Sequence, residues 1–151
     1  MPVRCEEILR EARTVVLHDW PSRDVPDTLT RAGYEVVVFG GPKPDDVFAS
    51  ELRDGEIVET RIGVPPGRGD LVYVFRPIEE LPGIVADAQR MGATAVWCQS
   101  GLSAEGVTDP RGCWTSEAES QEARRIVESA GLTYVADAYI ADAVRTLQGQ
   151  V

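Results

Sequence analysis

Short apolar runs recur along the chain at intervals that suit a regular alternation of strands and helices. The predicted strands cover residues 14–18, 34–39, 71–75, 93–98 and 132–136. Their nearly continuous apolar character is typical of strands that are buried on both faces of a sheet. Helical spacing of apolar residues predicts helices over residues 5–13, 24–33, 78–91, 116–130 and 140–147.

Capping residues mark the starts of two of these helices. Ser22 or Asp24 is expected to cap the helix that follows the first strand. Ser116 and Glu119 stand three residues apart before an apolar pattern, which predicts a capping box at the start of the fourth helix.

This order of elements predicts an α/β fold, namely a doubly wound, Rossmann-like five-stranded parallel sheet with helices on both faces. Residues 47–63 differ, because Asp54 and Gly55 lie between two short alternating segments. That pattern predicts a β-hairpin inserted after the second strand. Residues 1–151 are expected to form a single domain, since the length suits one domain and no linker or repeat interrupts the chain.

The net charge of the chain limits the classes of molecule that it is expected to bind. Lysine and arginine total 15 against 25 aspartates and glutamates, which gives a net charge of −10. This balance opposes nonspecific binding to nucleic acid, yet a few arginines or a helix N-terminus still suit a small anion. No apolar run approaches the roughly 20 residues of a membrane span, and no signal peptide is recognisable. We therefore expect a cytoplasmic protein without nucleic-acid or membrane partners, and a homodimer stays open.

The cysteine and histidine content predicts neither a metal site nor a catalytic centre. Cys5, Cys98 and Cys113 are widely spaced, and the chain has one histidine. Cys98 is expected to be a buried thiol, whereas Cys113 in a long loop is the candidate for a mixed disulfide. Ser22 and His18 share one loop without a nucleophile-elbow motif, so no catalytic residue is assigned. His18 is expected to be packed and hydrogen-bonded.

Candidate ligand contacts follow the first predicted strand, because ligands of such sheets bind beyond the C-terminal ends of the strands. Ser22 and Arg23 are candidate phosphate contacts, since a hydroxyl, a helix start and a guanidinium all favour an anion. Their structural alternative is a helix cap beside a solvated arginine. Trp20 is a candidate for stacking on a base, and its alternative is to plug the edge of the sheet.

The later turns hold further candidates. Gly40 and Gly41 permit a close approach of the backbone to a ligand. Arg76 emerges at the same end of the sheet, with an exposed salt bridge to Glu79 or Glu80 as its alternative. Gln99 follows the fourth strand and offers a hydrogen-bonding amide.

Two stretches of the chain resemble the small CoA-binding domain family, whose members are similar to the CoA-binding domain of the succinyl-CoA synthetase α subunit. The residues that carry this resemblance are Val74-Phe75-Arg76, Val96-Trp97-Cys98-Gln99-Ser100-Gly101, Ala130-Gly131-Leu132, Asp137 and Ile140. The chain departs from the family pattern at two turns. Asp19-Trp20-Pro21-Ser22 replaces a Gly-x-Ser motif, and Gly40-Gly41-Pro42 replaces Asn-Pro.

The resemblance implies a stand-alone protein that binds coenzyme A (CoA) or acyl-CoA and is non-catalytic or regulatory. It implies the diphosphate on the first turn, the adenosine across the turns after the second and third strands, and the pantetheine near the turn after the fourth. The candidate contacts are Trp20, Pro21, Ser22, Arg23, Gly40, Gly41, Pro42, Phe75, Arg76, Gln99, Ser100 and Gly101. An NAD(P)-dependent enzyme, a thiol-transfer enzyme and an interaction subunit with a vestigial nucleotide site stay open as alternatives.

Overall fold

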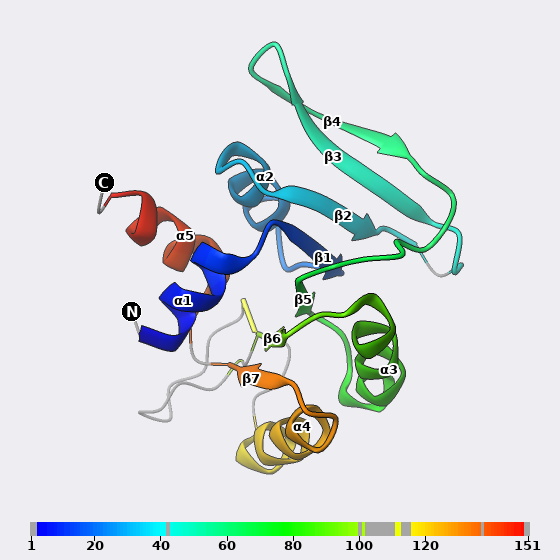
Figure 1. Ribbon diagram of the computed structural model, residues 1–151, viewed down its shortest axis with the longest axis vertical. Helices are drawn as coiled ribbons and strands as arrows, with labels where there is room; N and C mark the ends of the chain where they lie inside the picture. The colour runs from blue at the N-terminus through cyan, green and yellow to red at the C-terminus, as the bar shows by residue number, and fades with distance from the viewer. Residues whose placement is uncertain are drawn as a thin grey trace.

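A computed structural model describes residues 3–41, 43–99, 101, 111–112, 116–136 and 138–149 (Figure 1). The helices are α1 (Val3–Glu11), α2 (Asp24–Arg31), the short 3₁₀ helix η1 (Ile78–Glu80), α3 (Leu81–Met91), α4 (Glu117–Ser129) and α5 (Ile140–Gln148). The strands are β1 (Thr14–His18), β2 (Glu35–Phe39), β3 (Val47–Arg53), β4 (Glu56–Arg61), β5 (Leu71–Val74), β6 (Ala95–Cys98) and β7 (Thr133–Val135).

The described strands form one mixed, seven-stranded sheet in the order β4-β3-β2-β1-β5-β6-β7. The five strands β2, β1, β5, β6 and β7 lie side by side in this order, and each pair of neighbours is parallel. In contrast, β3 pairs antiparallel with β2, and β4 pairs antiparallel with β3. The predicted α/β fold is confirmed, and β1, β2, β5, β6 and β7 pair in parallel at the predicted places. The predicted total of five strands in a purely parallel sheet is corrected, because the hairpin joins the same sheet as two antiparallel strands. The inserted hairpin joins the edge of β2 and satisfies backbone groups that would otherwise face solvent.

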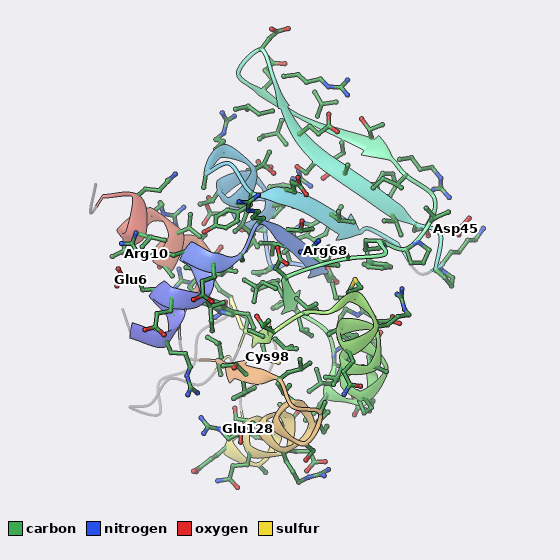
Figure 2. The ribbon with its side chains drawn as sticks, in the orientation of Figure 1. Glu6, Arg10, Asp45, Arg68, Cys98 and Glu128 are labelled. Carbon is green, nitrogen blue, oxygen red and sulfur yellow. The ribbon has the colours of Figure 1, made fainter. Side chains whose placement is uncertain are left out.

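Two apolar layers cover the sheet, one on each face. The first layer joins α1, α2 and α5 to the sheet, and the second joins α3 and α4 to the opposite face (Figure 1). Alternate residues of β1 and β6 serve opposite layers, because successive side chains of a strand point to opposite faces. Trp97 packs in the first layer and Cys98 in the second, where the thiol is fully buried, as predicted (Figure 2).

The two predicted helix caps have different outcomes. The Ser116 hydroxyl accepts a hydrogen bond from the Glu119 amide at 3.1 Å, which confirms the cap of α4. The predicted cap of α2 is wrong, because Arg23 occupies the N-cap position and makes no side-chain cap bond. The carboxylate of Asp24 instead accepts hydrogen bonds from Arg145, Thr28 and Tyr139. Arg145 of α5 therefore binds the Asp24 carboxylate, one of the two side chains that the sequence predicted as the cap of α2.

The connection from β4 to β5, residues 62–70, has no helix, and we call it the crossover segment. Gly69 packs so closely on β1 that an added Cβ would lie 2.7 Å from Val16 Cγ2. The Asp70 carboxylate accepts hydrogen bonds from the amides of Arg13 and Thr14, each at 2.9 Å, and so fixes the segment to the start of β1. None of the described helices has the length and apolar character needed to cross a membrane.

Candidate functional site

A cavity of about 1100 Å³ opens at the C-terminal ends of β1, β2 and β5. The helices that follow β1 and β5 cover opposite faces of the sheet, so the two strands flank a topological switch point (Figure 1). The residues that line the cavity are His18, Asp19, Trp20, Phe39, Gly40, Gly41, Lys43, Pro44, Pro65, Arg76, Glu80, Ile84, Asp87 and Arg90. Sheets of this kind bind their ligands at such a place.

One wall of the cavity is a pair of stacked rings. His18 and Phe39 end β1 and β2 in register, and their ring centroids lie 4.5 Å apart with 10° between the planes. His18 Nε2 is buried and has no hydrogen-bond partner among the described residues. Burial lowers the pKa of His18 from 6.5 to about 4, so the imidazole is neutral at pH 7. The sequence predicted a packed, hydrogen-bonded His18. The prediction of a hydrogen bond is wrong for Nε2, because the neighbour that packs on the ring is the apolar Phe39.

Arg76 connects the turn after β1 to the end of η1. Its guanidinium donates to Asp19 at 3.1 Å and to Glu80 at 2.8 Å. The hydrogen bond to Glu80, followed by that to Asp19, raises the pKa of Arg76. The ion pair with Glu80 is the structural alternative that the sequence offered for this residue. It leaves Arg76 at the wall of the cavity with its side chain about two-fifths exposed.

Two further cations line the cavity. Arg90 lies 3.6 Å from Asp87, a loose ion pair within α3. Lys43 forms no ion pair within the part of the chain that the structure describes, and its backbone amide donates to Asp46 at 3.0 Å. Lys43 and Arg90 therefore bring positive charge to this wall in a chain whose net charge is −10.

Asp19 supplies a conformation that glycine provides most easily. Its φ is 67°, in the left-handed region, which aspartate tolerates better than most residues. One carboxylate oxygen accepts the Trp20 amide at 2.9 Å and the other accepts Arg76. The turn after β1 therefore keeps a left-handed residue without the glycine that the family pattern places there.

The start of α2, where the sequence predicted a phosphate, already faces negative charge. Arg23 donates to Glu59 of β4 and, at 3.0 Å, to Asp27. Asp24 and Asp27 lie in the first turn of α2, where their negative charges already compensate the positive end of the helix dipole. The Arg23 guanidinium lies 5.7 Å from the Trp20 ring. In this arrangement Arg23 binds carboxylates of its own chain.

The structure brings some of the predicted contacts together at the cavity. Four of them line it: Trp20, Gly40, Gly41 and Arg76. Six other described residues of the predicted set do not: Pro21, Ser22, Arg23, Phe75, Gln99 and Gly101. Phe75 packs against the first apolar layer, and the Gln99 side chain accepts the Ile140 amide at 3.4 Å. Pro42, Ser100 and Cys113 lie outside the described residues. The role of each predicted contact in binding stays a prediction.

Comparison with known families identifies the family to which the chain belongs. A family model described as a CoA binding domain matches residues 15–141. The chain belongs to this CoA-binding domain family. The matched span contains the described strands, apart from Thr14 at the start of β1, and the whole wall of the cavity.

Solved structures with the same fold resemble this CoA-binding domain over nearly its whole length. One is a crystal structure described as Prb, a PH1109 protein redesigned for binding. It has a TM-score of 0.63 and 19% identity over 97% of this chain and 91% of that chain. Another, described as cell-free ID.343 from Thermus thermophilus, has a TM-score of 0.56 and 24% identity over 95% and 96%. No curated protein sequence matches the chain.

Several cavity residues of the CoA-binding domain were not predicted. Lys43 follows Gly40 and Gly41 by two residues and is the single lysine of the chain, a signal that was available in the sequence. Ile84, Asp87 and Arg90 had no such signal. Their place at the cavity depends on how α3 packs beside β5, which no local pattern encodes.

Proposed function

We propose that this CoA-binding domain binds CoA, or an acyl-CoA, as a stand-alone protein with a non-catalytic or regulatory role. The observation that carries the proposal is the cavity at the switch point between β1 and β5. Its volume of about 1100 Å³ suits a ligand of the size of CoA. Membership of the family supports the same ligand. The cytoplasmic location expected from the sequence stays a prediction.

Lys43 and Arg76 are the proposed contacts for the phosphates of the ligand. Lys43 forms no salt bridge among the described residues and has only an electrostatic interaction with Asp46, so binding an anion would break no salt bridge there. Arg76 now binds two carboxylates, and a guanidinium that holds carboxylates has the geometry to hold phosphate instead. Both residues lie at the cavity wall beside Gly40 and Gly41.

The start of α2 is the competing phosphate site. Ser22 and Arg23 were predicted for it, and the carboxylates of Asp24, Asp27 and Glu59 weaken the case. A phosphate there would have to displace Glu59 and Asp27 from Arg23 in a region of like charge. Arg76 also holds two carboxylates, so the difference between the sites is Lys43, which forms no ion pair among the described residues, together with the cavity that Lys43 and Arg76 line and Arg23 does not. We therefore place the phosphates at Lys43 and Arg76, and paired variants separate the two sites.

Calorimetric titration of the purified chain with CoA tests the function, with NAD⁺ as the matched nucleotide. The wild-type protein is expected to bind CoA more tightly than NAD⁺. The double variant Lys43→Ala with Arg76→Ala is expected to lose roughly tenfold to a hundredfold in CoA affinity, because charge-assisted hydrogen bonds disappear. The variant Arg53→Ala serves as a control, since it removes an exposed arginine of the hairpin that does not line the cavity.

Four outcomes would contradict the proposal or favour an alternative to it. Failure of the wild-type protein to bind CoA would overturn it. Tighter binding of NAD⁺ would favour an NAD(P)-dependent enzyme. An equal loss of CoA affinity in the variant Ser22→Ala with Arg23→Ala would move the phosphates to the start of α2. A thiol-transfer role requires Cys113, so loss of CoA-disulfide formation in Cys113→Ser would favour that alternative.

A second candidate function is an interaction subunit. Leu52, Ile62 and Val64 are apolar, between 43% and 59% exposed, and belong to the hairpin or the crossover segment. Leu52 lies near the hairpin turn, whereas Ile62 and Val64 stand two residues apart beyond the other end of β4. Exposed apolar side chains on such an extension favour a protein contact there. Sedimentation of wild type and of Ile62→Ser with Val64→Ser tests this, and a homodimer that the variant disrupts would support it.

A further inference from the structure

His18 has a chemistry that packing alone does not explain. It stands at the end of β1 against Phe39, in a cavity whose nearby apolar groups are Pro44, Pro65 and Ile84. Its Nε2 atom is buried and meets no hydrogen-bond partner among the described residues. A buried nitrogen without a partner costs stability, and a phenylalanine ring would fill similar space without that cost. The site therefore keeps a polar atom that the fold itself does not use.

The charge state of His18 is fixed by its surroundings. Burial dominates, while Asp87 from α3, Glu80 from η1 and Arg76 after β5 act as weaker neighbouring charges. The imidazole is neutral at pH 7, so one ring nitrogen donates and the other accepts. Phe39 already stacks on the imidazole, so the feature left for a ligand is the unpartnered ring nitrogen. A ring nitrogen pairs with a polar group in its own plane, and the polar edge of a flat heterocycle presents such groups.

We propose that His18 is the residue that selects the base of the bound ligand. In this proposal a purine lies edge-on to His18, in the plane of the imidazole, and its polar edge supplies the missing hydrogen bond to Nε2. The inference rests on the proposed binding of CoA, which carries one purine, adenine. Lys43 and Arg90 at the same cavity place positive charge within reach of phosphates attached to such a nucleoside.

The two halves of CoA separate this role from a general effect on binding. Calorimetry on wild type and His18→Phe uses CoA, adenosine 3′,5′-bisphosphate and 4′-phosphopantetheine as probes. His18→Phe keeps a ring beside Phe39 and removes the nitrogens. We expect affinity for CoA and for the adenosine bisphosphate to fall about tenfold, the effect of one lost hydrogen bond, with 4′-phosphopantetheine unchanged. The melting temperature at pH 7 is expected to stay the same or rise, because the buried nitrogen has gone.

A direct readout comes from the single histidine of the chain, which gives one set of imidazole signals in nuclear magnetic resonance. Adenosine 3′,5′-bisphosphate is expected to shift the carbon-bound imidazole protons by ring currents, and 4′-phosphopantetheine is not. Phe39→Leu removes the ring that stacks on His18 and orients the imidazole, and it is expected to weaken binding of the adenosine probe alone.

The outcomes distinguish this inference from the proposed function. If wild type does not bind CoA, the proposed function fails and the inference fails with it. If wild type binds CoA, and His18→Phe binds it equally well with no imidazole shift in wild type, the inference is overturned and the function stands. An equal loss of affinity for both halves of CoA, with a lowered melting temperature, would make His18 structural and would also overturn the inference.

Discussion

Burial of the His18 imidazole makes the stability of the protein depend on pH. The pKa of His18 is about 4 in the folded protein against 6.5 for an ordinary histidine. The unfolded chain therefore binds this proton more tightly than the folded protein does. The free energy of unfolding that depends on neutral His18 is therefore fully present above pH 6.5 and is lost as the pH falls toward 4.

Between pH 7 and pH 5 the wild-type protein is therefore expected to lose about 2 kcal/mol of unfolding free energy through His18. Ordinary carboxylates stay ionised over most of this range, and His18 is the single histidine. Urea unfolding at the two pH values, followed by tryptophan fluorescence, measures the change. His18→Phe should remove most of it, and an unchanged pH dependence in that variant would contradict the assignment.

Arg23 illustrates what residue-level prediction could not reach. A serine and an arginine before a helix predicted an anion site, and each side chain lies where the sequence placed it, beside the start of α2. Besides the local Asp27, Arg23 binds Glu59, which lies 36 residues away on β4. No local pattern identifies that carboxylate, because the hairpin reaches Arg23 only after it has joined the sheet.

At the scale of elements, the crossover segment contributes Pro65 to the wall of the site. In doubly wound folds a helix commonly connects two parallel strands and covers the sheet. Here residues 62–70 connect β4 to β5 without one, and Pro65 lines the cavity beside His18 and Phe39. The close contact between Gly69 and Val16 holds this segment against β1.

Gly69→Ala is expected to lower the unfolding free energy by about 1–3 kcal/mol, the usual effect of overpacking. The added Cβ would lie 2.7 Å from Val16 Cγ2, and Val16 is fully buried, so it has little freedom to move. Gly67→Ala is the matched control in the same segment, because a methyl group added there would meet no described atom within 4 Å. Urea unfolding compares the two variants. Equal stability would show that the segment adjusts freely.

The Asp54-Gly55 turn gives a second lesson at this scale. The hairpin was predicted correctly, since turn residues and alternation are local signals, and β3 and β4 flank that turn. Its pairing with β2 was not predicted. Attachment to an edge depends on backbone groups of β2 and on contacts such as the buried hydrogen bond between Thr30 and Ser50 at 3.0 Å.

At the scale of the whole molecule, two apolar layers share one sheet. Leu29 belongs to the layer of α1, α2 and α5, and Leu81 belongs to the layer of α3 and α4. Both are fully buried. Each strand of the central sheet contributes side chains to both layers, so unfolding of one layer removes the support of the other.

Leu29→Ala and Leu81→Ala are each expected to lower the unfolding free energy by about 2–5 kcal/mol in a single transition. The reason is that a cavity in either layer weakens the sheet that both layers share. Urea curves recorded by tryptophan fluorescence and by far-ultraviolet circular dichroism should coincide for each variant. Separate midpoints in Leu81→Ala would show that the α3–α4 layer unfolds independently.

The sequence by itself determined the local elements: the apolar runs that became β1, β2, β5, β6 and β7, the helices between them, the hairpin turn and the Ser116 cap. These depend on periodicity and turn chemistry within a few residues. The tertiary structure alone decided the seven-strand order, the residues of α3 and the crossover segment that line the cavity, the burial of the His18 nitrogen and the pairing of Arg23 with Glu59. Those features arise where distant segments meet, so their energies depend on packing and burial that no short window of residues contains.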